Sequence, residues 1–138
     1  MSQENVEIVR RMFEAFVQGL ERGNPGAAFD TGTLAADVEW QTSDLMGAET
    51  FRGREGFIEF MRRWTEDFQG YGIQLERLID AGDDRVVGLL HQWATGKGSG
   101  VPVELNLAIV YELDASRVIR MCNYTNQAEA LEAAGLSE

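Results

Sequence analysis

His91 is the only histidine of the chain, and imidazole is the one side chain that titrates near neutral pH without a perturbing environment. It stands two residues before Trp93 in a strand-like stretch, so the two side chains are expected on the same face. One interpretation is a general acid or base. The alternative is a sheet-face histidine that is exposed or packed in a dimer interface, because the sequence places no partner beside it. With no second histidine and no characteristic carboxylate spacing, we expect no metal site.

Four large side chains predict the wall of an interior pocket. Trp40 lies on an expected strand, and Phe57, Met61 and Trp64 share one face of an expected helix. Each residue alone is explained by ordinary core packing. Together, two indoles from different elements direct large rings into one interior, and methionine adapts to ligands of varied shape. We therefore expect a pocket for a small, largely apolar molecule.

Two neighbouring strands would add a few polar groups to this pocket. Glu104, Asn106 and Ala108 alternate along one strand, and Met121 and Asn123 alternate along the next. A few polar groups in an apolar cavity are typical of ligand sites. The alternative for Asn106 and Asn123 is the outer face of the sheet, since a single bulge reverses every assignment on a strand.

Hydrophobic periodicity and turn residues predict the elements that position these side chains. Apolar residues at helical spacing from Val6 to Leu20 predict a first helix, which Gly23-Asn24-Pro25 ends. Gly70-Tyr71-Gly72 is expected to end the second long helix. Ser2 can cap the start of the first helix. The other expected elements are helices at 25–29, 54–68 and 127–134, a loop at 43–53, and strands at 37–42, 73–80, 85–95, 101–113 and 117–126.

This order predicts the α+β class, because helices come first and a meander of long strands comes last. The strands are expected to form a strongly curved antiparallel sheet. One face would close on the N-terminal helices, and the other would meet solvent or a second subunit. The chain of 138 residues fits one domain spanning residues 1–138.

Charge and composition exclude several partners. The net charge of −11 and the lack of a basic cluster argue against nucleic acid and anionic membrane surfaces. No signal peptide or membrane-spanning run is found, and Cys122 is the only cysteine, so a cytoplasmic location is expected. The run 96–100 lacks P-loop spacing and a following helix, so it predicts a hairpin tip. We expect no cofactor.

Six stretches of the sequence carry a family resemblance: 4–11, 37–40, 51–56, 79–83, 96–101 and 124–136. They resemble the SnoaL-like branch of the nuclear transport factor 2-like superfamily, and the resemblance covers nearly the whole chain. It implies a cone-shaped half-barrel sheet closed by the N-terminal helices, an enclosed pocket, and a homodimer that packs through the outer sheet face. It implies no single reaction, because the superfamily includes ketosteroid isomerases, polyketide cyclases, epoxide hydrolases, dehydratases and proteins that only bind.

The ketosteroid isomerase branch requires a carboxylate base and an oxyanion hole made from a tyrosine and a protonated aspartic acid. When the elements are matched, the position of the base falls near Thr42, that of the tyrosine on Phe16, and that of the aspartic acid near Ala108. None of the three can do this chemistry, so we expect no steroid isomerisation by this route and assign them to the pocket wall. Asp44, two residues past Thr42, is the nearby carboxylate that could substitute as a base.

The cyclase-like relatives resemble the chain most closely at its tail, where many have a tyrosine and then an aspartate two residues later. Here the pair is Tyr124 and Asn126. An amide cannot remove a proton, but it can orient a carbonyl or hydroxyl group.

Three functions follow from these observations. The main interpretation is a protein that binds a small, largely apolar molecule, because the aromatic lining is present and the expected catalytic carboxylates are absent. An isomerase, cyclase or hydrolase and a structural dimer or protein-interaction module are the alternatives. The enzyme would take its base and its polarising group from His91, Asp44, Glu104, Asn126, Asn106 and Tyr124.

Overall fold

The computed structural model describes residues 2–24, 26–42 and 49–136. Its elements follow the predicted order of helices and strands. In chain order they are α1 (Ser2–Glu21), η1 (Ala27–Asp30), β1 (Leu34–Gln41), β2 (Thr50–Arg52), α2 (Gly53–Asp67), β3 (Phe68–Gly82), β4 (Arg85–Gly96), β5 (Pro102–Asp114), β6 (Arg117–Tyr124) and α3 (Gln127–Ala133).

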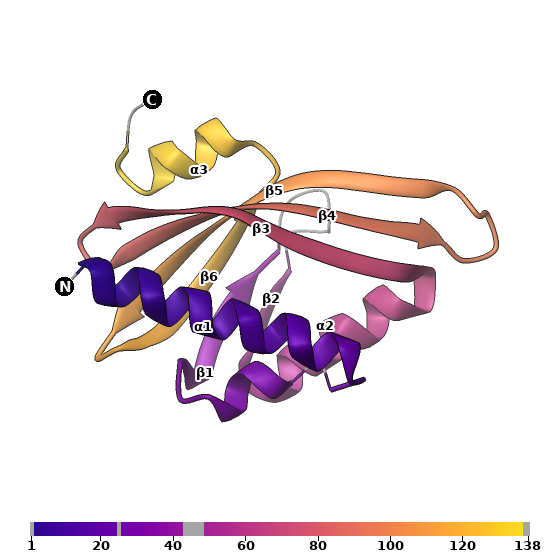
Figure 1. The fold of residues 1–138 in the computed structure, drawn as a ribbon, viewed down its shortest axis with the longest axis horizontal. Helices are drawn as coiled ribbons and strands as arrows, with labels where there is room; N and C mark the ends of the chain where they lie inside the picture. The colour runs from indigo at the N-terminus through magenta and orange to yellow at the C-terminus, as the bar shows by residue number, and fades with distance from the viewer. Residues whose placement is uncertain (1, 25, 43–48, 137–138) are drawn as a thin grey trace.

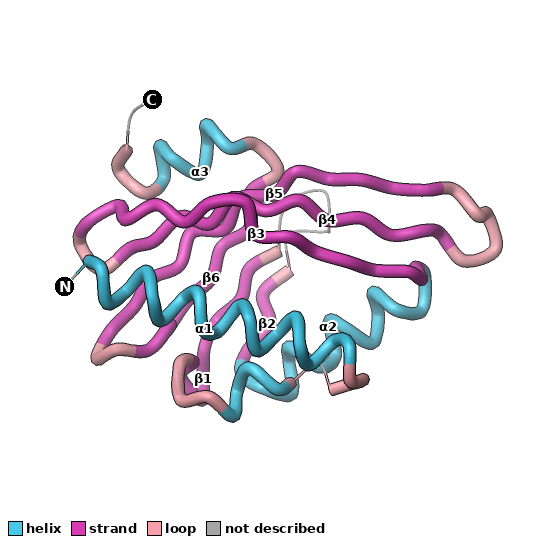
Figure 2. The backbone as a smooth tube through the Cα atoms, viewed as in Figure 1, coloured by secondary structure: helices cyan, strands magenta, loops and turns pink. Residues whose placement is uncertain are grey.

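A curved, unclosed sheet of six strands forms the body of the molecule, which confirms the α+β class. Helices α1 and α2 lie against one face of the sheet, here called the inner face (Figure 1). Helix α3 packs on the opposite, outer face. The backbone view shows the β4–β5 hairpin extending past the helices (Figure 2). Register shifts along β1, β3 and β6 account for much of the curvature, since bulges bend strands.

The strand order is β2-β1-β6-β5-β4-β3. An antiparallel sheet was expected, and the structure corrects this at one position, because β1 and β6 are parallel. Parallel neighbours need a long connection, and here the whole β3–β5 meander lies between them in the chain. The pairing places Trp40 opposite Met121 and so joins two expected pocket residues from distant parts of the sequence.

Two local expectations are wrong. The segment at 50–52, predicted as loop, is strand β2, in which Phe51 pairs with Trp40. Gly70-Tyr71-Gly72, predicted to end a helix, lies inside β3. Gly70 has φ of 63°, and the register with β4 shifts between Gln69 and Gly72. The glycines therefore mark a bulge in a strand and not a helix terminus.

The core lies mainly between the inner face and α1. Val9, Met12 and Phe13 are buried on one stripe of α1, as the helical spacing predicts. On β5 the alternate residues Leu107, Ile109 and Tyr111 face this core. The residues between them pack on the outer face beneath α3, which sets the phase of the strand. No helix in the described ranges is long and apolar enough to cross a membrane.

Candidate functional site

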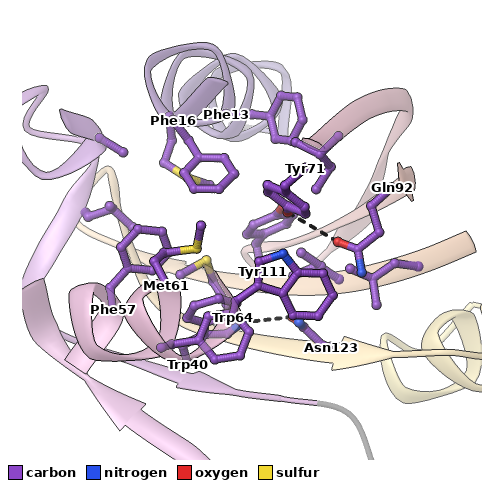
Figure 3. Close-up of a pocket in the computed structure, with 18 of the residues that line it drawn as sticks. Phe13, Phe16, Trp40, Phe57, Met61, Trp64, Tyr71, Gln92, Tyr111 and Asn123 are labelled. Atoms are coloured by element: carbon purple, nitrogen blue, oxygen red, sulfur yellow. Dashed lines mark hydrogen bonds between the residues drawn. The ribbon is translucent and has the colours of Figure 1, made fainter. Parts of the chain in front are cut away.

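A small cavity lies between the inner face of the sheet and helices α1 and α2 (Figure 3). Its volume is about 80 Å³, which is room for several water molecules but less than most ligand sites, which hold roughly 300–1,000 Å³. Large apolar side chains from the helices and the strands dominate its wall. They include Phe16, Trp40, Phe57, Met61, Trp64, Tyr111 and Met121.

A larger cleft adjoins this inner cavity. Its volume is about 420 Å³, and it lies between the β2–α2 region and the ends of β4 and β5. Four residues line both spaces, which are therefore adjacent: Phe60, Trp64, Gln92 and Leu105. We call these four residues the neck. The cleft falls within the usual size of ligand sites, and the inner cavity lies next to it on the core side of the neck.

Ring contacts hold the α2 side of the site in place. Residues at spacings of three and four put Phe57, Phe60 and Trp64 on one helix face. The Trp40 ring lies 5.1 Å from that of Phe57 and 4.3 Å from that of Phe60, centroid to centroid. The Phe16 ring of α1 meets Phe57 edge-on at 5.5 Å. Such tilted and edge-to-face pairs stabilise a defined arrangement of rings, so the aromatic wall has a specific packing geometry.

Two hydrogen bonds organise the polar groups of the site. The Trp40 indole Nε1 donates to Asn123 Oδ1 at 2.9 Å, and the Tyr71 hydroxyl donates to Gln92 Oε1 at 3.3 Å (Figure 3). These bonds occupy both amide oxygens and leave the NH₂ groups of Gln92 and Asn123 to act as donors. Asn123 was an expected pocket residue, whereas Tyr71 and Gln92 were not. The alternation of β4 around buried Leu90 could have identified Gln92.

The Trp64 indole nitrogen is the exception to this pairing. It is buried, and it has no hydrogen-bond partner within the described part of the chain. A buried donor left without a partner costs about 1–3 kcal/mol, so such groups are rare in native proteins.

The titratable groups of the inner cavity are the phenols of Tyr71 and Tyr111. Burial raises the pKa of both hydroxyls far above neutral pH, so both stay protonated. Within the described residues, the wall of the inner cavity contains no histidine, carboxylate, lysine or arginine. The inner cavity therefore has hydrogen-bond donors but no group that exchanges a proton near pH 7.

His91 lies on the outer face, away from the cavity. Its Nδ1 is 2.9 Å from Asn106 Oδ1, and its Nε2 is 2.9 Å from Glu104 Oε1. The hydrogen bond with Asn106, then that with the Glu104 carboxylate, raises the pKa of His91 against the opposing effect of burial. With both ring nitrogens engaged, His91 has no free position for a substrate proton.

The expected phase of β5 is corrected by the structure. Glu104, Asn106 and Ala108 do not line the inner cavity, because Leu105 and Leu107 do. Of the three, Glu104 lines the adjoining cleft. A shift of one residue moves a whole alternating set to the other face of a sheet. Ala108 is fully buried in the outer-face cluster with α3 residue Ala130.

The remaining candidates lie elsewhere. Thr42 is buried, its hydroxyl donates to the Glu49 carbonyl, and with Tyr124 it lines a separate small recess. Asn126 is the N-cap of α3, where its side-chain oxygen accepts from the Glu129 backbone amide at 3.2 Å. Asp44 lies outside the described residues. The structure therefore brings none of the expected catalytic residues to the inner cavity.

Seven of the ten expected pocket residues do come together there. They derive from α1, β1, α2 and β6, and they are Phe16, Trp40, Phe57, Met61, Trp64, Met121 and Asn123. Across the described ranges, no cluster of three or more histidine, cysteine, aspartate or glutamate residues is arranged to hold a metal ion.

With this geometry established, the comparisons identify the class of protein. A family model described as a SnoaL-like domain matches residues 9–121, so the chain belongs to the SnoaL-like domain family. The predicted resemblance to this branch of the nuclear transport factor 2-like superfamily is thereby confirmed. No curated protein matches the chain.

Solved structures share the whole architecture. A nuclear transport factor 2-like protein from Burkholderia thailandensis is 26% identical with a TM-score of 0.72, covering 92% of this chain and 96% of its own. One of unknown function from Burkholderia pseudomallei is 22% identical with a TM-score of 0.72, covering 94% and 95%. TerC, co-crystallised with polyporic acid, is 19% identical with a TM-score of 0.71, covering 96% and 98%. At this level of identity the shared property is the fold.

Proposed function

We propose that the protein binds a small, largely apolar molecule that lies in the cleft and inserts one end into the inner cavity. The observation that carries this proposal is that the two spaces are adjacent and share the neck residues Phe60, Trp64, Gln92 and Leu105 as their common wall. The inner cavity of about 80 Å³ alone would hold little more than water. Together with the cleft of about 420 Å³, it provides a site of ordinary ligand size.

The chemistry of the wall favours binding over acid–base catalysis. General acid–base catalysis needs a group with a pKa near the working pH within hydrogen-bond reach of the substrate. The tyrosines of the inner cavity are held neutral by burial, and His91 points to the other face. Glu49, Asp67 and Glu104 line only the cleft and not the inner cavity. TerC, a neighbour of the same fold, was crystallised with polyporic acid, which supports a small-molecule role for this architecture.

A matched pair of valine variants at the start of β5 tests the proposal. Val103 lies in β5, lines the cleft and is 38% exposed, whereas Val101 directly precedes β5, is 55% exposed and lies outside the cleft wall. We expect Val103→Trp to fill the cleft and weaken binding at least about tenfold, because the new indole takes the volume of the ligand. Val101→Trp adds the same bulk two residues earlier, just before β5, and should leave affinity unchanged.

Binding is measured by thermal shift across a library of apolar carbonyl compounds, followed by titration calorimetry on those that stabilise the protein. Stabilisation of the wild type by library members, lost only in Val103→Trp, supports the proposal. Absence of stabilisation by any member, or equal affinity in both variants, contradicts it.

Two further observations support proposals about the assembly and the location of the protein. Trp93 is 41% exposed on the outer face beside His91, and a large exposed ring on an open sheet face favours a homodimer formed there. Cys122 is buried as a free thiol, which supports a cytoplasmic location.

A further inference from the structure

We infer that the indole N–H of Trp64 donates a hydrogen bond to an acceptor oxygen of the ligand, at the neck between the cleft and the inner cavity. The inference rests on the proposed function and specifies its ligand. The ligand class is a flat, ring-containing, uncharged molecule with a carbonyl oxygen at its edge.

The first support is that Trp64 breaks the pattern set by the other tryptophans. Trp40 Nε1 is paired with Asn123 Oδ1 at 2.9 Å, and Trp93 is 41% exposed. Trp64 Nε1 is buried and has no partner among the described residues. Buried indoles normally find an acceptor, so the missing acceptor is a property of this site.

The second support is what surrounds the Trp64 ring. Phe68 stacks on it with centroids 4.4 Å apart, and Tyr71 meets it edge-to-face at 5.5 Å. Aromatic faces are weak acceptors compared with a carbonyl oxygen. Figure 3 shows Trp64 among the rings in the middle of the site, where a ligand passing through the neck would contact it.

The third support comes from Gln92, which shares the neck with Trp64. Its amide oxygen accepts from Tyr71, so its NH₂ group is a second donor on the same wall. Two donors at one constriction suit an oxygen with two lone pairs and disfavour a ligand that presents only its own donors there.

The electrostatics of the neck indicate a neutral oxygen. No lysine or arginine in the described ranges lines the inner cavity. Arg63, at the cleft wall, pairs with Glu49 and Glu59. An anion buried at the neck would lack a countercharge, whereas a ketone, quinone or lactone carbonyl needs only the donors present.

The test uses two probes of nearly the same shape, indan-1-one and indane, which differ by a carbonyl oxygen. We expect the wild type to bind indan-1-one roughly five- to tenfold more tightly than indane. Trp64→Phe keeps an aromatic ring but removes the N–H, and it should remove this preference. Tyr124→Phe also removes one polar hydrogen from an aromatic side chain, but Tyr124 lies outside both the inner cavity and the cleft, so this control should retain the preference.

A spectroscopic readout keeps the test decisive even where Trp64→Phe does not fold. The chain has three tryptophans, so a ¹H–¹⁵N spectrum shows three indole signals. Loss of one signal in Trp40→Phe and of another in Trp93→Phe assigns the Trp64 signal by elimination. Indan-1-one should shift this signal strongly downfield, and indane should not.

The outcomes separate this inference from the proposed function. If neither probe binds, the apolar site itself is contradicted and the inference falls with it. If both probes bind with equal affinity and shift the Trp64 signal by the same amount, the apolar binding site is supported and the role of Trp64 is overturned. A carbonyl preference that persists in Trp64→Phe also overturns it, because another donor must then hold the oxygen.

Discussion

His91 is of a residue type common in active sites, but here its ring is held by hydrogen bonds to neighbouring side chains of the sheet. Its position on the outer face, with Asn106 and Glu104 on the neighbouring strand, makes it part of a polar cross-strand cluster. Asn126 is a similar case, because a side chain expected to polarise a substrate serves here as a helix cap. At the scale of single residues, the neighbours therefore decide the role of each group more than its chemical type.

The His91 cluster predicts a pH-dependent stability. The raised pKa of His91 means that the folded state favours the protonated ring, which can donate to both partners. The stabilisation is therefore complete below about pH 6.5, the ordinary pKa of histidine, and is lost as pH rises through the higher folded-state pKa. We expect the difference in unfolding free energy between wild type and His91→Gln, measured in urea, to fall over that interval. In a Glu104→Gln background this difference in unfolding free energy should be smaller. A difference that grows with pH would contradict the stabilising role of protonated His91.

The cap at Asn126 predicts a stability effect without a binding effect. Asn126→Ala removes the acceptor for the Glu129 amide and should lower the unfolding free energy by about 1 kcal/mol. Asn126→Asp keeps an acceptor oxygen and should retain most of the stability, as measured by urea denaturation. Loss of ligand affinity in Asn126→Ala at unchanged stability would show that the side chain acts on the ligand instead.

Among the elements, the packing of β3 on β4 requires a glycine opposite a tryptophan ring. A Cβ atom at Gly72 would lie 2.3 Å from Cζ2 of Trp93, so the strand accommodates this ring only because residue 72 has no side chain. Glycine in a strand interior often marks such a close approach. The bulge between Gln69 and Gly72 adds bending to the same region, where β3 follows α2 at the cleft.

This dependence predicts a change of sign in a double-mutant cycle. Gly72→Ala alone should destabilise the protein by about 1–3 kcal/mol, because the Trp93 ring must move. In a Trp93→Ala background the same change should be neutral or stabilising by up to about 1 kcal/mol, because alanine restricts the unfolded chain. Thermal denaturation of the four proteins measures the coupling, and additive effects would contradict the contact.

For the whole molecule, the two faces of the sheet differ in what covers them. The inner face, covered by α1 and α2, holds the cavity, whereas the outer face is covered only in part, by α3 (Figure 1). One sheet can thus form a binding site on one side and an interface on the other, because side chains alternate between its faces. An acidic chain of net charge −11 makes a dimer interface sensitive to added negative charge.

The proposed dimer predicts a position-specific response to a charge. Trp93→Glu places a carboxylate in the outer face and should shift the protein from dimer to monomer in analytical ultracentrifugation. Ile58→Glu adds the same charge to α2 at an equally exposed apolar residue, 41% in each case, and should leave the dimer intact. A wild-type monomer at micromolar concentration, or equal dissociation by both variants, would exclude an interface at Trp93.

Local patterns in the sequence determined the class, the order of elements and most of the pocket wall. Helical spacing placed Phe57, Met61 and Trp64 on one face, and this property needs no information from distant residues. Two turn-like patterns misled, since strand β2 and the glycine bulge at 70–72 form only against their partner strands. Local propensity cannot report pairing between distant segments.

Tertiary structure alone decided which face of each strand lines the cavity. The phase of β5, and with it the position of Asn106 and Ala108, depends on its register with β4 and β6. The pairing of Trp40 with Asn123 spans the chain from β1 to β6, and the unpaired indole of Trp64 is visible only once every neighbour is in place. Spacing along the chain specifies which residues share a face, whereas long-range packing specifies where that face points.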